Sequence, residues 1–221
     1  MPQSKLFDTA ALALADLSAS ATIMVGGHAG VGVPRGLLSA LASRGVSGLT
    51  LITDACDGQS AEALALITAR QVQSLVCPPP IDRSWDEAVL HHVQLGSLQL
   101  EPIPRGTLSE RIRAAGAGIG AFLVYPHPDP AVNAGKERQQ LDGREYVIET
   151  PLRADFALLR AHKADTLGNL IYQGTGRNWN PVMATAATTV VVEVDEVVEP
   201  GSLDPEAVIT QGIYVDRIVE A

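Results

Sequence analysis

Cysteine, positive charge and long hydrophobic runs are all scarce in this chain of 221 residues. The two cysteines, Cys56 and Cys77, stand apart from each other and from any histidine at metal-ligand spacing, which disfavours a zinc site or a disulfide framework and predicts two reduced thiols. The formal charge is −9, so the chain lacks the basic stripe that a nucleic-acid partner requires. No hydrophobic run approaches the length of a membrane span.

The first twenty residues also lack the features of a secretory signal. The stretch "MPQSKLFDTAALALADLSAS" has a single lysine, and Asp8 and Asp16 interrupt its apolar part. We therefore expect a protein of the cytoplasm, with neither a membrane nor a nucleic acid as partner. The leucines at 12, 14 and 17 indicate a first helix.

Glycine, in contrast, is concentrated in residues 25–34, "VGGHAGVGVP". A β-prone run at 21–24 precedes this stretch and a helical pattern at 35–45 follows it, which predicts a strand, a tight loop and a helix start. Free backbone N–H groups at such a helix start suit an anion or an oxyanion. The candidate binding residues in the loop are Gly26, Gly27, His28, Gly30 and Gly32.

Two other interpretations of this loop remain open. A dinucleotide-binding turn has the spacing G-x-G-x-x-G, whereas this loop reads G-G-x-x-G-x-G and continues to Pro34. The glycines could also serve only to permit a sharp turn at positive φ. His28 would then be a turn residue rather than part of a site.

The remaining pattern alternates strands with helices and predicts a mainly parallel sheet. We expect strands at 48–53 and 121–125 (the latter buried), helices at 61–70 and 86–92, and a helix that a Thr107–Glu110 capping box starts and that Gly116 and Gly118 end. Residues 77–85 and 126–135 are predicted loops. The C-terminal third is β-rich, with strands at 144–149, 154–165, 169–174 and 188–198 and a short helix near Pro181.

No assembled nucleophile is visible in the sequence. There is no G-x-S-x-G elbow, and Cys56 has no neighbouring histidine. We place His91 and His92 on a solvated helix and His162 at a strand end. The expected catalytic set is therefore none, and no metal site is expected.

Four stretches together resemble the α (A) subunit of family I CoA-transferases, of the 3-oxoacid and 3-oxoadipate type. They are "IMVGGHAGVGVP", "GTLSERIRAAGAGIGAF", "GKERQQLDGREYVIETPLRADFALLRAHKADTLGNLIYQGTGRNWNPVMATAA" and "VVEVDEVVEPGSLDPEAVITQGIYVDRIV". The resemblance is strong from Gly135 onward and weak between Asp54 and Leu100. It implies one α/β domain over 1–221: a three-layer, mainly parallel sheet with helices on both faces, similar to ribose-phosphate isomerase, and a β-rich C-terminal part.

The resemblance also implies a partner and a chemistry. In such enzymes the acyl-CoA is attacked by a glutamate of the B (β) subunit, which forms a glutamyl-CoA thioester. That glutamate belongs to a Ser-Glu-Asn-Gly-like stretch, which this chain lacks, so the isolated chain should be inactive. We expect a heterotetramer with a B subunit, coenzyme A as a substrate and no other cofactor, with this chain forming the wall of the acyl pocket.

The sequence departs from the family pattern at four places. His28 replaces a usual Phe in the loop whose preceding Asp-Gly is here Ala19-Ser20, and Asp54 lies in "TDACD", which replaces Ser-Asn-Asn-Ala-Gly. "LVCPPPIDRSW" replaces Ser-Tyr-Val-Gly-Glu-Asn-Lys. Arg105, followed by Gly106, replaces a common Gln and offers a planar fork to a second carboxylate of the substrate, unless it faces solvent.

We therefore expect a CoA-transferase subunit that acts on a 3-oxo acid or a dicarboxylate. A CoA-thioester hydrolase, or a hydrolase of a ring-derived CoA ester, is a second hypothesis, because His28 and Asp54 could position water. A non-catalytic binding subunit is a third. A sugar-phosphate isomerase on the related fold fits the C-terminal sequence least well.

Overall fold

The computed structural model describes residues 4–54, 61–79 and 85–221. The predictions that concern Ala55, Cys56 and residues 80–84 fall outside these described residues. Cys77 carries a free, buried thiol. No helix in the described part of the chain is long and apolar enough to cross a membrane.

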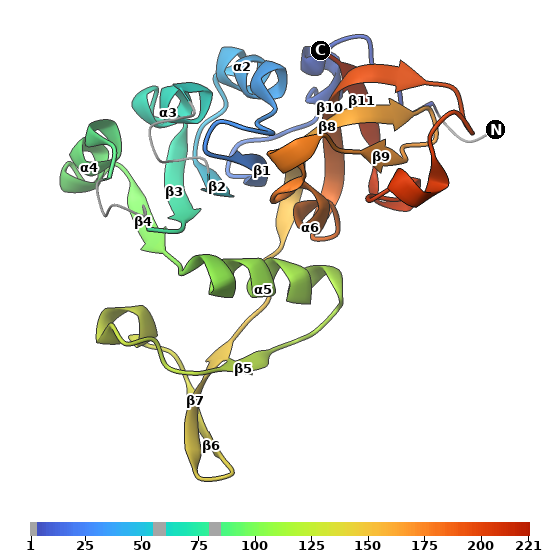
Figure 1. The fold of residues 1–221 in the computed structure, drawn as a ribbon. Helices are drawn as coiled ribbons and strands as arrows, with labels where there is room; N and C mark the ends of the chain where they lie inside the picture. Colours follow the sequence, from blue (N-terminus) through green and yellow to red (C-terminus); the bar gives the residue numbers. More distant parts are fainter. Residues whose placement is uncertain (1–3, 55–60, 80–84) are drawn as a thin grey trace.

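A parallel sheet forms the centre of the molecule, in the order β11-β10-β8-β1-β2-β3-β4 (Figure 1). Its strands are β1 (Thr22–His28), β2 (Leu49–Asp54), β3 (Val72–Cys77), β4 (Gln99–Pro102), β8 (Ala154–Asp165), β10 (Ala187–Val198) and β11 (Arg217–Glu220). The short β9 (Leu170–Ile171) pairs antiparallel with β8. The chain builds β1 to β4 outward in one direction and then returns to place β8 on the other side of β1.

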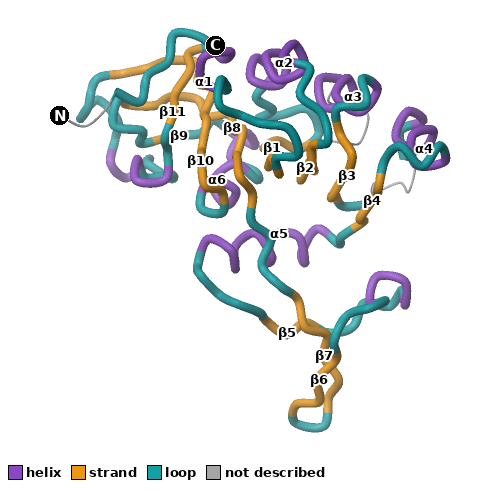
Figure 2. The backbone as a smooth tube through the Cα atoms, turned by 180° about the vertical axis from the view of Figure 1, so that it is seen from behind, coloured by secondary structure: helices purple, strands orange, loops and turns teal. Residues whose placement is uncertain are grey.

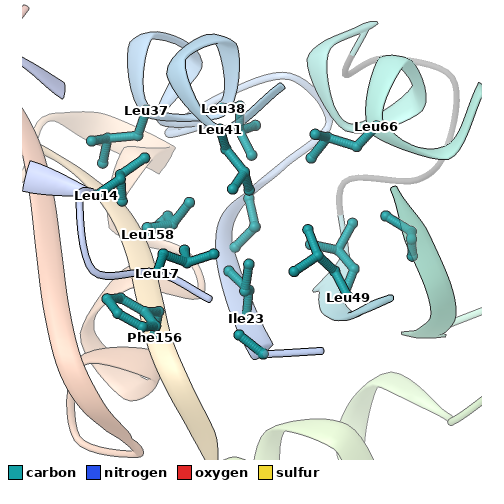
Figure 3. Close-up of a cluster of buried hydrophobic side chains, with 14 of the residues drawn as sticks. Leu14, Leu17, Ile23, Leu37, Leu38, Leu41, Leu49, Leu66, Phe156 and Leu158 are labelled. Carbon is teal, nitrogen blue, oxygen red and sulfur yellow. The ribbon is translucent and has the colours of Figure 1, made fainter. Parts of the chain in front are cut away.

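Helices cover both faces of this sheet. On one face lie α1 (Ala10–Ala13), α2 (Arg35–Arg44), α3 (Ala61–Thr68) and α4 (Glu87–Gln94), and on the other α5 (Arg105–Gly116) and α6 (Asn180–Ala184) (Figures 1 and 2). Successive residues of a strand pack on opposite faces of the sheet. Ile23 packs in the cluster with α2 and α3 shown in Figure 3, whereas Met24 packs in the cluster with α5 and α6. Because both faces are covered, the central strands β1 and β2 are mainly buried along their length. The predicted three-layer α/β fold is confirmed.

A second, smaller sheet projects from the body beyond α5 (Figures 1 and 2). It contains β5 (Phe122–Val124), β6 (Arg138–Leu141) and β7 (Arg144–Glu149) in the antiparallel order β5-β7-β6. Asp142 and Gly143 form the predicted turn, both at positive φ. The strand predicted at 121–125 is present but is only half-buried, because it pairs in this small sheet rather than in the core.

Several other boundaries and environments differ from the sequence predictions. The first helix spans only Ala10–Ala13, and Leu12 is exposed. Helix α5 starts at Arg105, two residues before Thr107, because the Pro104 carbonyl accepts its first hydrogen bond and no capping box forms. His92 is buried, with Nδ1 3.0 Å from Ser97 Oγ, so its expected solvated position was wrong.

Four 3₁₀ turns complete the described chain: η1 (Pro130–Asn133), η2 (Gly174–Arg177), η3 (Pro205–Ala207) and η4 (Gly212–Tyr214). The first lies in the predicted loop at 126–135, and the second precedes α6. The predicted short helix near Pro181 is α6, in which the proline occupies the first turn.

Candidate active site

A bulge in β1 sets the position of His28. Val25 pairs with Thr53 of β2 and His28 pairs with the next residue, Asp54, so Gly26 and Gly27 have no partners on β2. Bulges of this kind bend a strand and re-aim the side chain that follows them. The strand therefore extends four residues beyond its predicted end, through part of the expected glycine loop, and brings His28 beside Asp54.

Both bulge residues need to be glycine. A Cβ on Gly26 would lie 1.8 Å from Oδ1 of Asn180, and one on Gly27 would lie 2.5 Å from Cγ2 of Val33. Gly27 also has a φ of +112°, which L side chains rarely adopt. The tight turn that follows is closed by backbone bonds in both directions between His28 and Val31.

The carboxylate of Asp54 lies at the end of β2 and is almost fully buried, at 3% exposure. Arg105 reaches it from the start of α5: Nε donates to Oδ2 at 2.9 Å and Nη2 donates to Oδ1 at 2.9 Å. Trp179 Nε1 donates to Oδ2 at 2.9 Å from the turn before α6. A buried carboxylate requires such donors, because an unpaired charge in the interior is costly.

His28 adds a further contact to the same carboxylate. Its Nδ1 lies 2.9 Å from Asp54 Oδ2, an ion-pair distance, although the ring is not oriented for a hydrogen bond and Nδ1 is buried without one. The side chain as a whole is 38% exposed, so its other ring atoms provide the accessible surface.

These side chains line one pocket of about 360 Å³. Its lining residues are His28, Asp54, Arg105, Ser109, Asn178, Trp179 and Val182. The pocket lies where the carboxyl ends of parallel strands β1 and β2 meet, beside the point at which the strand order reverses, the usual ligand position in open α/β sheets. Three predicted site residues are thus brought together; their role in substrate binding remains a prediction.

The start of α6 supplies a group that the sequence analysis did not identify. Asn180, fully buried, donates through Nδ2 to the carbonyls of Gly32 and Gly176 and accepts from the Arg160 N–H. It therefore ties the glycine turn to β8. The signal available in the sequence was the polar and aromatic run "RNWN" directly before Pro181.

The start of α2, where we expected an anion or oxyanion to bind, already holds a carboxylate of the protein. Pro34 is the N-cap and offers no side-chain acceptor, and Glu193 from β10 accepts the Leu37 N–H at 2.9 Å. Glu193 is buried and also pairs with Arg160. A Cβ on Gly36 would lie 2.8 Å from Glu193 Oε2, so glycine permits this approach.

A second, smaller pocket of about 190 Å³ lies beside Gly32, with Arg160, His162, Tyr172 and Asp195 in its wall. The hydrogen bond from His162 holds the pKa of Asp195 below its usual value, with Arg160 adding to the effect. Burial raises the pKa of Tyr172 to about 12. Gly32 is one of the lining residues of this second pocket and is not among those of the pocket that contains His28.

The other predicted glycines have distinct environments. Gly30 lies in the turn at a φ of +75° and its carbonyl accepts from Arg35. Gly106 lies in the first turn of α5, with open space where a Cβ would be. Among the described residues, no group of three or more His, Cys, Asp or Glu side chains is placed to hold a metal ion.

Three of the departures from the family pattern meet in this pocket, since His28 and Arg105 both contact Asp54. Ser20, which stands where the resemblance predicts Gly, has a φ of +63°. The Arg105 side chain is 32% exposed and paired, so it does not simply extend into solvent.

Comparison with known proteins agrees with this architecture. The family model described as "Coenzyme A transferase" matches residues 7–221. The chain is 43% identical to the A subunit of 3-oxoadipate CoA-transferase from Pseudomonas putida, over 98% of this chain and 93% of that protein. It is 40% identical to the alpha subunit of acetate CoA-transferase from Escherichia coli K12, over 90% of this chain and 89% of that protein.

Solved structures show the same fold at lower identity. The decarboxylase AibA/AibB has a TM-score of 0.83 and 22% identity, over 99% of this chain and 84% of that chain. Glutaconate coenzyme A-transferase from Acidaminococcus fermentans has a TM-score of 0.83 and 18% identity, over 99% and 76%. At these identities the likeness concerns the fold alone.

The chain therefore belongs to the coenzyme A transferase family. Within this family its relatives are subunits of the A type, so the predicted resemblance and the predicted CoA-transferase class are confirmed. The names of these relatives imply a partner subunit.

Proposed function

We propose that this chain pairs with a B-type subunit in a heterotetramer and transfers CoA from an acyl-CoA to a carboxylic acid. The acid is a 3-oxo acid or a dicarboxylate, a proposal supported by relatives named for 3-oxoadipate and 3-ketoacids. Residues 1–221 act as one domain in the cytoplasm, with coenzyme A as substrate and without a metal or redox cofactor. Gly26, Gly27, Gly30 and Gly106 shape the surroundings of the bound acyl group, and Gly32, which lines the smaller pocket, does so through the turn that it shares with Gly30.

One observation supports the placement of the nucleophile on the partner subunit and of the pocket wall on this chain. Asp54 is the only carboxylate among the described residues that line the larger pocket, and Arg105 and Trp179 occupy both of its oxygens. A carboxylate held by an arginine fork is a poor nucleophile, because attack would break these charge-assisted bonds. We therefore assign the nucleophilic glutamate to the partner and the pocket wall to this chain.

The experiment is intact-protein mass spectrometry of the two co-expressed chains after incubation with a panel of CoA esters and borohydride. Borohydride reduces a glutamyl-CoA thioester, so we expect a mass change on the partner alone. Absence of CoA exchange with every pair of donor and acid would refute the proposal. A mass change on this chain would refute the assignment of the nucleophile.

Thioester hydrolysis is a second candidate, favoured by the proximity of His28 to buried Asp54. His28 would take a proton from water as the oxygen attacks the thioester carbonyl, and the departing CoA thiolate would receive that proton. Release of free acid without an acceptor, abolished in His28→Gln, would support hydrolysis. Transfer that persists in His28→Gln, without hydrolysis in the parent enzyme, would exclude it.

A further inference from the structure

The guanidinium of Arg105 is only partly used by its partner. Asp54 occupies the edge formed by Nε and Nη2, with three contacts of 2.9–3.1 Å. Among the described residues, Nη1 has one bond, a long one of 3.4 Å to the Pro79 carbonyl. The described residues therefore leave the outer edge, formed by Nη1 and the second N–H of Nη2, open at a side chain that is 32% exposed and lines the pocket.

Asp54 fixes the plane in which that outer edge lies. Its carboxylate is 3% exposed and is held from the other side by Trp179. Since an arginine fork binds a carboxylate in its own plane, a fixed guanidinium presents two parallel N–H groups at a defined position. Pre-organisation of this kind reduces the entropy lost when a ligand binds.

The residues around the pocket indicate a third side chain, besides Asp54 and Arg105, that takes part in binding a carboxylate. Asp54 on β2 and Arg105 on α5 neutralise each other, and Ser109, Asn178 and Trp179 are neutral. A second carboxylate on the outer edge of Arg105 would need a further hydrogen-bond donor. The imidazole of His28 lines the same pocket and is, among the described lining residues, the one other side chain that belongs to the basic class.

We propose, resting on the proposed function, that Arg105 and His28 bind the distal carboxylate of a dicarboxylic acyl group and that Asp54 is the positioning residue. The pocket thereby selects a 3-oxo diacid over a 3-oxo monoacid.

The test measures KM and kcat of the complex with its B subunit for 3-oxoadipate and for the monoacid acetoacetate. We expect Arg105→Gln to raise KM for the diacid about tenfold, the loss of one charge-assisted pair, and to leave KM for the monoacid within about twofold. His28→Gln should raise KM for the diacid more than KM for the monoacid, because it removes the second contact to the distal carboxylate.

Two further variants keep the test decisive. Arg113→Gln removes an exposed arginine from the same helix, where it pairs with Glu110, and should change neither KM. The double variant Asp54→Asn, Arg105→Gln removes both pocket charges, so that no buried carboxylate is left unpaired if Arg105→Gln fails to fold. It should show the same loss of diacid preference.

Equal changes in KM for both acids would overturn this inference. In that case, transfer to the monoacid would leave the proposed function intact. Failure of transfer with every acid would instead count against the proposed function itself.

Discussion

At the scale of single residues, Gly27 and Gly106 show how differently two glycines of one predicted site act. Gly27 sits in the β1 bulge at a φ of +112° against Val33, whereas Gly106 has open space around it in α5. We expect Gly27→Ala to lower the free energy of unfolding by about 2–4 kcal/mol, from strain and overpacking. Gly106→Ala should raise it by up to about 1 kcal/mol.

Urea unfolding of the two variants measures this difference. The bulge geometry would be contradicted by equal unfolding midpoints for Gly27→Ala and the parent protein. A destabilised Gly106→Ala would show that the position needs glycine for a reason other than packing.

The sequence located His28, Asp54 and Arg105 one by one, but not their contact. His28 follows a glycine pair, Asp54 ends a strand and Arg105 precedes a helical pattern, and each position suggests a site. Their meeting depends on the β1 bulge and on the register of two parallel strands, which no local pattern encodes. The contacts of Trp179 with Asp54 and of Asn180 with Gly32 could not be found in this way, because each joins residues more than a hundred positions apart in the chain.

At the scale of elements, helix α2 depends on a distant strand for its cap. Pro34 cannot accept a side-chain hydrogen bond, so Glu193 of β10 accepts the Leu37 N–H and also pairs with Arg160. A carboxylate at this end also interacts favourably with the positive end of the helix dipole. The glycine turn is thus fixed on one side by Glu193, through α2, and on the other by Asn180.

We expect Glu193→Ala to lower the free energy of unfolding by about 2–4 kcal/mol, because it removes a buried ion pair and a helix cap. Glu110→Ala is the matched control, since its partner Arg113 is exposed, and should change stability by less than about 1 kcal/mol. Chemical denaturation of both variants gives the comparison. Equal effects would show that Glu193 does not anchor α2.

Strands alternating with helices were enough to predict the parallel sheet, because apolar strands of this kind need cover on both faces. The small sheet was harder to predict. Strand β6 reads Arg-Gln-Gln-Leu and is exposed throughout, so it carries no hydrophobic alternation. The order of strands could not be predicted from the sequence either, since β8 pairs with β1 although more than half of the chain separates the two strands in sequence.

At the scale of the whole molecule, the partly buried phenol of Tyr172 links global stability to alkaline pH. Tyr172 follows β9, and its hydroxyl shares a hydrogen bond of 2.7 Å with Thr210 Oγ1, which joins two distant parts of the C-terminal third. Burial raises its pKa from 10.0 to about 12. The folded state thus keeps the phenol neutral where the unfolded chain ionises it.

The sign of the effect follows from this order of pKa values. A group whose pKa is raised in the folded state contributes stability that is complete below the unfolded pKa of 10.0 and is lost as the pH rises toward 12. Between pH 9 and pH 11 the parent protein should therefore lose about 1.4 kcal/mol through Tyr172 alone.

Tyr172→Phe keeps the ring buried, lacks the ionising group and should not show this part of the loss. Urea unfolding of both proteins at the two pH values measures the difference, in which the other three tyrosines cancel. Parallel losses in the two proteins would mean that the phenol is solvated in the folded state, and that the Tyr172 wall of the smaller pocket is open to water.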